Sequence, residues 1–440
     1  MAKKDYIFDE SFKKQWHSLL KQKTIEFKFT PSQTRVFLTR FNYDNWLKTI
    51  EDIWQASEVN SFESFVKHST NIYKILEDYC PESKGRQQKF TVIRDWLLAE
   101  FNPGTSLNRG IETELFIKEK QECYQAISQP GALIRIKAPS KMGKSRFLNS
   151  VLNYAQEKQY NTVHINLLQI ESSKFANLDR FLRWFCIYLS DALDLNSELD
   201  NYWSQDRGSM LSCTRYLEMI LSQFEQPLVL GLDEVDRLLN YPDISQDFFY
   251  LLRSWHEEAN NDELWEKLRL IVVYSTEDFG SLDINQSPFN VGLPIELKSL
   301  ERSQVVELAK SYNLELSETE INLLVKMLGG HPYLTDLILS SLIKSPQKNL
   351  EQILQQSTTD TGIYDSYLRQ HLIKLTDNPK LSAIYLKVLK SSQPIQIDTL
   401  LAYQLYRMGL IKWSPENNAV IPRCELYKQY FMPRLTINQG

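Results

Sequence analysis

The stretch Ile134-Arg135-Ile136-Lys137-Ala138-Pro139-Ser140-Lys141-Met142-Gly143-Lys144-Ser145 decides the fold of this chain. Its first residues are typical of a buried strand, and the apolar positions that follow it, from Phe147 on, indicate a helix. Between them lies a loop of the form Ala-x-x-x-x-Gly-Lys-Ser. That loop differs from the full Walker A pattern at one position, because Ala138 stands where the pattern has a glycine. We therefore predict a strand, a phosphate-binding loop and a helix, in this order.

The residue types of this loop suit a nucleoside polyphosphate bound with Mg²⁺. Backbone N–H groups can curl around phosphate oxygens only where a residue tolerates positive φ, and Gly143 meets that need. Lys144 would place its ammonium between the β- and γ-phosphates, and the Ser145 hydroxyl would reach Mg²⁺ at the positive end of the helix dipole. A chance Gly-Lys-Ser in a surface loop is the alternative. The predicted nucleotide-binding residues of the loop are Ala138, Pro139, Ser140, Lys141, Met142, Gly143, Lys144, Ser145 and Arg146.

A second motif supports the first. Residues 227–234 form an apolar run that ends in Asp233 and Glu234, and its composition suits a parallel strand buried on both faces. Two carboxylates are unfavourable to bury unless they have a task. We expect Asp233 to hold Mg²⁺ through water and Glu234 to polarise the attacking water, so that Glu234 and Lys144 are the predicted catalytic residues. The alternative is a strand that ends in two solvated acids at the start of a helix.

The order of predicted elements indicates an α/β P-loop NTPase core. Strands that alternate with helices predict right-handed crossovers and a parallel sheet, with ligands at the carboxyl ends of the strands. Ser275 ends one strand and would contact the γ-phosphate or the attacking water, although ordinary turn chemistry also explains a hydroxyl there. We assign the core to the additional-strand class. The apolar runs that predict strands are 133–137, 162–167, 228–232, 268–274 and 291–297.

Composition excludes several classes of protein. A net charge of −5 gives no electrostatic case for non-specific binding to nucleic acid. No apolar stretch approaches the length of about 18 to 20 residues that a membrane span needs, and the N-terminus lacks the apolar core of a secretory signal. The five cysteines are scattered without metal-ligand spacing, which suits a reducing cytoplasm. We predict a cytoplasmic protein that contacts no membrane and has no metal site other than that for Mg²⁺.

Residues 1–100 are predicted to form a separate helical domain. Thr30-Pro31-Ser32-Gln33 is a strong helix start, with a capping residue, a proline at the first position and a glutamine that closes a capping box. No catalytic constellation is visible here, so we interpret the domain as a module that binds a protein partner. Asn102-Pro103-Gly104 marks the joint to the core, which we assign to 101–300. Arg109, just beyond the joint, could contact the base of the bound nucleotide. The alternative is an ordinary surface arginine.

Two further regions follow the core, a helical lid at 301–378 and a winged-helix-like domain at 379–440. In the lid, two glycines end one helix and Pro332 opens the next; the functional alternative is that Pro332 packs against the bound nucleotide. In the last region, two helices and two short strands around a turn at 414–418 predict a winged helix. Its second helix carries little charge, namely Asp398 and Arg407, which favours a wing that packs on protein over one that contacts DNA.

Residues 130–145 resemble the start of the bacterial AAA-like domain family, which belongs to the signal-transduction ATPases with numerous domains, usually shortened to STAND. In that family an alanine at the first loop position is usual, as at Ala138. The resemblance covers roughly residues 101 to 433, and residues 1–100 lie outside it. Further blocks that resemble the family, in the same order, are 232–238, 273–277, 287–292, 329–334 and 409–431.

The resemblance implies an ATP/ADP switch with slow, Mg²⁺-dependent hydrolysis. Gly330-x-Pro332 matches the motif whose proline approaches the base, and movement of the lid would alter how the N-terminal domain meets a protein partner in signalling or defence. Such proteins also assemble into nucleotide-dependent homo-oligomers. No arginine stands in the helix after Pro332, where many AAA+ proteins carry one. Two alternatives remain: a DNA-acting ATPase regulator of the transposition or target-selection type, and a nucleotide-binding scaffold that does not hydrolyse.

Overall fold

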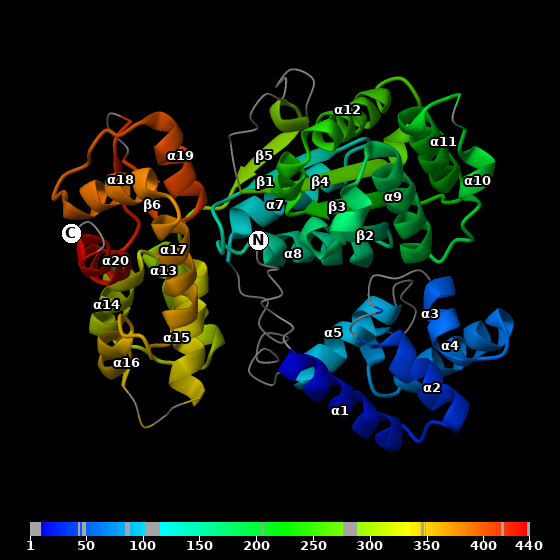
Figure 1. The fold of residues 1–440 in the computed structure, drawn as a ribbon, viewed down its shortest axis with the longest axis horizontal. Helices are drawn as coiled ribbons and strands as arrows, with labels where there is room; N and C mark the ends of the chain where they lie inside the picture. The colour runs from blue at the N-terminus through cyan, green and yellow to red at the C-terminus, as the bar shows by residue number, and fades with distance from the viewer. Residues whose placement is uncertain are drawn as a thin grey trace. The chain divides into compact units, whose positions relative to one another are not determined.

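The computed structural model shows a chain that divides into two compact units (Figure 1). The first unit holds residues 1–109 and 169–223, and the second holds 110–168 and 224–440. Each unit is described by itself. The residues that the structure describes are 10–42, 45, 50–83, 89–101, 115–204, 206–275, 288–344, 347, 349–414 and 418–437.

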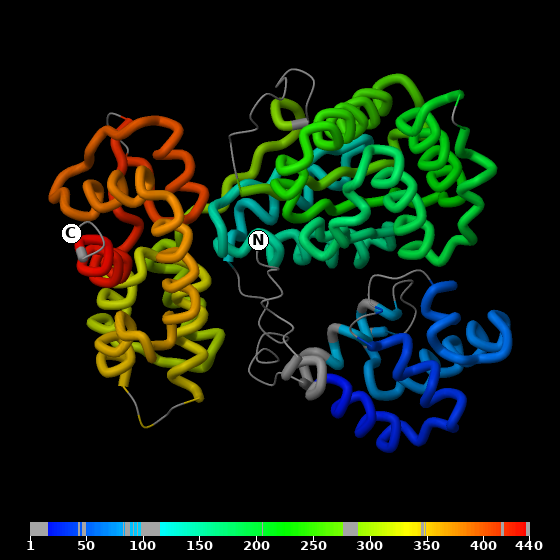
Figure 2. Tube along the Cα trace, in the orientation of Figure 1, coloured from blue at the N-terminus to red at the C-terminus, as the bar shows by residue number. Residues whose placement is uncertain are grey.

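The N-terminal part of the first unit is helical, as the sequence predicts (Figure 2). Its core is aromatic: Trp16 and Phe65 are buried, and Trp16 Nε1 donates a hydrogen bond to the Phe41 carbonyl at 2.9 Å. The second helix begins as predicted, because the Thr30 hydroxyl accepts a hydrogen bond from the Gln33 N–H at 3.3 Å. The elements are α1 (Glu10–Glu26), α2 (Pro31–Arg40), α3 (Ile50–Ala56), α4 (Phe62–Leu76), the 3₁₀ turn η2 (Pro81–Ser83) and α5 (Lys89–Phe101).

The rest of the first unit is built on a packed pair of helices, α9 and α11. Cys186 and Cys213 face each other with their sulfurs 3.6 Å apart, and the Ser190 and Tyr216 hydroxyls share a hydrogen bond of 2.6 Å. The division into two units groups residues 169–223 with the N-terminal helices. The domain boundaries predicted from the sequence, at residues 100, 300 and 378, stay predictions. The elements are η4 (Ser172–Phe175), α9 (Leu178–Ala192), α10 (Leu199–Tyr202) and α11 (Ser209–Ser222).

The second unit is organised around a parallel sheet of five strands in the order β2-β3-β4-β1-β5. All residues of β3 and β4 are buried, as expected for central strands covered on both faces. Because β4 lies between β1 and β3, the sheet has the additional strand that the sequence predicts, and the predicted fold class is confirmed. The strands are β1 (Leu133–Lys137), β2 (Asn161–Asn166), β3 (Leu228–Asp233), β4 (Leu268–Tyr274) and β5 (Leu293–Glu296).

Helices cover both faces of this sheet, with α8 on one face and α12 on the other (Figure 1). The approach of α8 to β3 is close. A Cβ on Gly231 would lie 3.0 Å from Leu148 Cδ1 and 3.3 Å from Leu152 Cδ1, so a side chain at this position would require both leucines to shift. The elements around the sheet are α7 (Ile117–Ile127), α8 (Lys144–Glu157), η3 (Leu167–Gln169), η5 (Val235–Asn240), α12 (Pro242–Glu258), η6 (Trp265–Lys267) and η8 (Pro288–Asn290).

Five lid helices follow the sheet. As predicted, a helix ends at a glycine, with Gly329 in the left-handed conformation at φ 60°, and Pro332 opens the next helix. Ser317 caps α14 in a capping box with Glu320. The lid helices are α13 (Arg302–Ser311), α14 (Glu318–Leu328), α15 (Pro332–Lys344), α16 (Leu350–Gln356) and α17 (Asp365–Thr376).

The chain ends in what we call the C-terminal region, residues 379–437. Its two strands pair antiparallel, and a bridge between Ile395 and Val420 adds a third segment beside them. The hairpin lies where the sequence predicts one, while its identity as a winged helix stays a prediction. The elements are α18 (Pro379–Lys390), α19 (Thr399–Arg407), β6 (Ile411–Trp413), β7 (Val420–Pro422) and α20 (Glu425–Ile437). Within the described part of the chain, no helix combines the length and the apolar character needed to cross a membrane.

Candidate nucleotide-binding site

The loop between β1 and α8 has the backbone form of a phosphate cradle. Lys141 and Gly143 are both in the left-handed region, at φ 63° and 92°, and α8 begins at Lys144. Left-handed residues of this kind turn successive N–H groups toward one concavity. A Cβ on Gly143 would meet nothing within 4 Å, so the glycine is needed for its backbone angle and not for space. Ala138, at the position where the full pattern has glycine, is buried beside the end of β4, and its N–H donates to the Tyr274 carbonyl at 3.4 Å.

Lys144 lies in the position from which its ammonium can reach a phosphate. The residue is 4% exposed, and its Nζ donates a hydrogen bond to the Pro139 carbonyl of its own loop at 3.1 Å. Burial lowers the pKa of Lys144, and the charges of the nearby acids Glu234, Asp236 and Asp233 oppose that effect. A cation folded back onto the loop carbonyl fits a site in which phosphate oxygens would take over that contact.

Asp233 ends β3 as a fully buried carboxylate. Its oxygens accept hydrogen bonds from the Glu234 N–H at 2.9 Å and from Asn166 Nδ2 at 3.4 Å. Burial acts to raise the pKa of Asp233, yet the neighbouring His164 ring, a hydrogen bond from Ser145 and the charge of Lys144 leave it below its ordinary value. The carboxylate therefore stays ionised next to the Ser145 hydroxyl. An ionised carboxylate and a hydroxyl side by side form an oxygen-ligand set of the kind that Mg²⁺ takes.

Glu234 follows in a strained backbone conformation, at φ 57° and ψ 42°. Left-handed conformations are rare for residues other than glycine and occur often at functional sites. Burial raises the pKa of Glu234, the charge of Lys144 opposes this, and Asp233 and Asp236 raise it further. A carboxylate with a raised pKa is a stronger proton acceptor than an ordinary glutamate.

Two groups at this edge of the sheet were not foreseen from the sequence. His164 and Asn166 stand on β2, where Asn166 is in register with Asp233 of β3. Both support the Asp233 carboxylate, since Asn166 donates to it and His164 Nε2 lies 3.9 Å from its Oδ2. The available signal was the pair of polar residues near the carboxyl end of the predicted strand 162–167.

Ser275 lies at the end of β4, between β1, which leads into the loop, and β3, which ends in Asp233. The Ser275 N–H donates to Asp236 Oδ2 at 2.7 Å, and both residues are buried. Asp236 thus ties the turn after β3 to the end of β4. Contact between the Ser275 hydroxyl and a nucleotide stays a prediction.

The lid helix α15 adjoins the loop. Lys141 Nζ lies 5.4 Å from the centre of the Tyr333 ring, and Arg146 forms an ion pair with Asp336 at 3.7 Å. Pro332 is buried at the start of this helix, and its predicted approach to the base stays a prediction. Arg109 lies outside the described residues, so its predicted role stays a prediction as well.

The C-terminal region also contacts the loop, which the sequence did not predict. The Ser140 N–H donates to the Arg407 carbonyl at 3.1 Å. Arg423 Nη1 lies 4.0 Å from the Met142 sulfur, and a Cβ on Gly409 would be 3.5 Å from the Ser140 carbonyl oxygen. The candidate site therefore joins the sheet, the lid and the C-terminal region.

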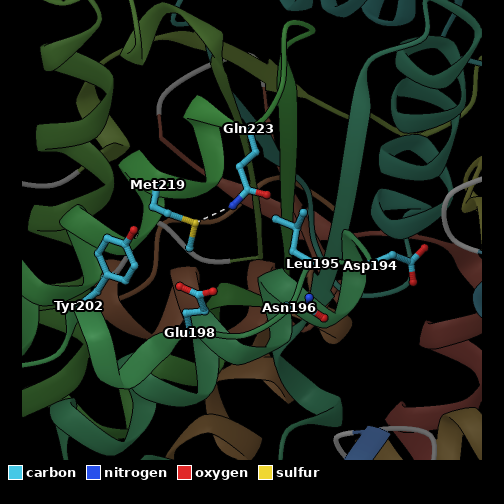
Figure 3. A pocket seen from close by; sticks show the side chains of 7 residues that line it. All are labelled: Asp194, Leu195, Asn196, Glu198, Tyr202, Met219 and Gln223. Atoms are coloured by element: carbon cyan, nitrogen blue, oxygen red, sulfur yellow. Dashed lines mark hydrogen bonds between the residues drawn. The ribbon is translucent and has the colours of Figure 1, made fainter. Parts of the chain in front are cut away.

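A cavity of about 340 Å³ lies in the first unit, and none of the predicted site residues lines it. Its wall is polar, and Gln223 donates a hydrogen bond to the Met219 sulfur at 2.9 Å across one side (Figure 3). The lining residues are Asp194, Leu195, Asn196, Glu198, Tyr202, Met219 and Gln223.

Two solved structures have a fold similar to that of this chain. The Walker-type ATPase PABY2304 of Pyrococcus abyssi aligns with a TM-score of 0.55 at 15% identity, over 74% of this chain and 97% of its own. The ORC2 protein of Aeropyrum pernix, in ADPNP–ADP complexes, aligns with a TM-score of 0.51 at 12% identity, over 76% of this chain and 98% of its own. At such identities the likeness shows the fold alone.

Sequence comparison adds a curated relative and a family. An uncharacterized WD repeat-containing protein of Synechocystis sp. is 25% identical over 154 residues, which are 33% of this chain and only 13% of that relative. A family model described as AAA-like domain matches residues 107–433, which is most of the chain and includes the loop, both acids, the lid and the hairpin. The chain therefore belongs to the AAA-like domain family.

Proposed function

We propose that the protein is an ATP/ADP-dependent switch of the STAND type that hydrolyses ATP slowly with Mg²⁺. One observation carries the proposal: the loop that would hold the phosphates is contacted by both the lid and the C-terminal region. Lys141 and Arg146 reach α15, and the Ser140 N–H is bonded to α19. A change in the occupant of the loop would therefore act directly on two regions outside the sheet.

Each polar residue at the site has a role in this proposal. Lys144 and the backbone N–H groups of residues 141–146 would bind the phosphates, and Ser145 and Asp233 would hold Mg²⁺, which supplies positive charge to the phosphate oxygens. Glu234 would orient the attacking water and accept its proton. The A. pernix ORC2 protein, which has the same fold, was solved in complexes with ADPNP and ADP, and this supports ATP and ADP as the ligands here.

The N-terminal helices would present the surface for a protein partner in signalling or defence. Their core is closed and aromatic, yet Ile25 is 79% exposed at the end of α1 and Tyr79 is half-exposed beyond α4. Exposed apolar side chains of this size suit contact with protein. Assembly into a homo-oligomer in one nucleotide state belongs to the same proposal.

The nucleotide carried by the purified protein tests the proposal. Protein would be denatured and the released nucleotide identified for wild type, Lys144→Ala and Glu234→Gln. We expect near-stoichiometric ADP from wild type, none from Lys144→Ala and retained ATP from Glu234→Gln. A wild type that is empty and stays empty after incubation with Mg²⁺–ATP would overturn the proposal, and ATP retained unchanged by wild type would favour the scaffold that does not hydrolyse.

A DNA-acting ATPase is the second candidate, and the β6–β7 hairpin favours it because wings of this kind often bind DNA. In this structure, however, the last residue of α19 is bonded to the loop. DNA binding that requires ATP and weakens steeply with salt would support this candidate.

A further inference from the structure

Arg423 is the most deeply buried cation of the C-terminal region that contacts the loop. It stands between β7 and α20 and is 4% exposed. Nη1 donates to the Ser299 hydroxyl at 3.1 Å and lies 4.0 Å from the Met142 sulfur, while Nη2 donates to the Ile411 carbonyl at 2.9 Å. The guanidinium is thus held at the junction of the loop, the end of the sheet and the hairpin.

The hydrogen-bonding capacity of this guanidinium is incompletely used. Its Nε is buried and has no hydrogen-bond partner. Arg269, an equally buried arginine, differs: its Nε donates to the Ile127 carbonyl at 3.1 Å, and its Nη1 donates to the carbonyls of Glu266 and Leu268. Arg135 Nε is also buried without a hydrogen-bond partner, so an open donor alone does not distinguish Arg423.

The charge of Arg423 also lacks a counter-charge. Among the residues that the structure describes, no carboxylate lies within ion-pair distance of its guanidinium. Lys144, the other buried cation at the loop, is surrounded by the acids Asp233, Glu234 and Asp236. A buried charge is retained when it is paired, and a guanidinium fork matches phosphate geometry particularly well.

A second buried nitrogen at this junction is also unpartnered. His331 is fully buried just before Pro332, and its Nδ1 has no hydrogen-bond partner. A Cβ on Gly409 would lie 3.9 Å from His331 Nε2 and 3.8 Å from Pro139 Cβ, so this histidine lies next to the loop as well. The lid helix α15 faces the loop with an acid, Asp336, which pairs with Arg146. This contact from the lid therefore brings no positive charge to the loop.

Resting on the proposed function, we infer that Arg423 is a phosphate ligand of the bound nucleotide, supplied by the C-terminal region to the loop of the sheet. The phosphate would supply the negative charge and the hydrogen-bond acceptor that the Arg423 guanidinium lacks among the described residues. Its attraction for Arg423 would hold the C-terminal region against the loop while a polyphosphate is bound.

The test is equilibrium binding of Mg²⁺–ADP to the full chain, with inorganic pyrophosphate as a competitor that has phosphates and no base. Arg423→Met keeps an unbranched, largely apolar stem and removes the charge, and Arg423→Lys keeps the charge. Arg434→Met is the matched control, because Arg434 lies in α20 of the same region and pairs with Asp360 at 2.8 Å on the surface.

We expect Arg423→Met to weaken ADP and pyrophosphate binding about 10- to 100-fold, the loss typical of a hydrogen bond to a charged group. Arg423→Lys should recover most of that loss, and Arg434→Met should bind as wild type does. A purely structural arginine would instead lower the unfolding temperature of the protein without nucleotide and leave the ADP-induced rise in that temperature intact.

Three outcomes separate the inference from the proposed function. Wild-type affinity in both Arg423 variants, with binding lost in Lys144→Ala, overturns the role of Arg423 and leaves the switch standing. Should Arg423→Met fail to fold, Arg423→Gln removes the charge with a polar side chain: weaker binding of ADP and pyrophosphate in folded Arg423→Gln supports the inference, and wild-type affinity for both overturns it. Absence of nucleotide binding in wild type overturns both claims.

Discussion

The two adjacent acids at the end of β3 differ in their environments. Burial acts to raise the pKa of Asp233, but the neighbouring His164 ring, a hydrogen bond from Ser145 and the charge of Lys144 bring it below its ordinary value. Burial raises the pKa of Glu234, and that rise persists. Neighbouring carboxylates whose pKa values are pushed apart are typical of one group that stays charged and one that exchanges a proton. Asp233 then suits Mg²⁺, and Glu234 suits the attacking water.

The first prediction concerns pH. Glu234 must be deprotonated to accept a proton, and because its pKa is raised, protonation begins at a higher pH than for an ordinary glutamate. ATP hydrolysis should therefore fall on mild acidification while Asp233, whose pKa is lowered, stays ionised and ADP still binds. Rate and ADP affinity would be measured in parallel from neutral to acidic pH. A rate and an affinity that fall together over the same range would contradict the assignment.

The second prediction concerns His164. His164→Ala removes a polar ring beside the carboxylate that lowers the pKa of Asp233, so that pKa should rise and binding of Mg²⁺–ADP should weaken about tenfold, as for other residues that support a metal ligand. ADP affinity measured with a chelator in place of Mg²⁺ should change little. His17→Ala, in exposed surface of α1, serves as control. Equal losses with and without Mg²⁺ would show that His164 acts on something other than the metal site.

At the scale of elements, the sequence predicted what depends on local patterns. Apolar runs located all five strands to within two residues, and the capping residues Thr30 and Pro332 marked the starts of their helices. Contacts that depend on the order of the strands, or on the packing of regions far apart in the sequence, have no local sequence pattern and were not predicted. His164 reaches Asp233 only because β2 neighbours β3, and Arg423 reaches Met142 across most of the second unit's sequence.

The third prediction concerns the packing of α8 on the sheet. Gly231→Val places side-chain atoms where Leu148 and Leu152 already lie, so it should lower the free energy of unfolding by about 1–3 kcal/mol, the usual effect of overpacking. Because α8 carries Lys144 and Ser145 in its first turn, nucleotide affinity should fall as well. Urea unfolding and ADP titration would measure the two effects. An unchanged free energy of unfolding would mean that α8 can move without strain. The close packing of α8 on β3 at Gly231 would then contribute nothing to stability.

At the scale of the molecule, the second unit links its regions through one loop. Residues 138–146 carry the predicted phosphate ligands and also contact α15 and the C-terminal region. The hydrophobic core continues from the sheet into the lid and α20, so these regions pack as parts of one unit. A ligand that changes the loop should therefore change the stability of α19 and β6 more than that of the sheet.

Amide hydrogen exchange across residues 399–413 tests the switch most directly. It would be measured for wild type without nucleotide, with ADP and with a non-hydrolysable ATP analogue, and for Lys144→Ala under the same conditions. We expect exchange in α19 and β6 to differ between the ADP and ATP-analogue states of wild type, and Lys144→Ala to give one pattern throughout. Identical exchange in the two nucleotide states, with both nucleotides shown to be bound, would contradict the switch.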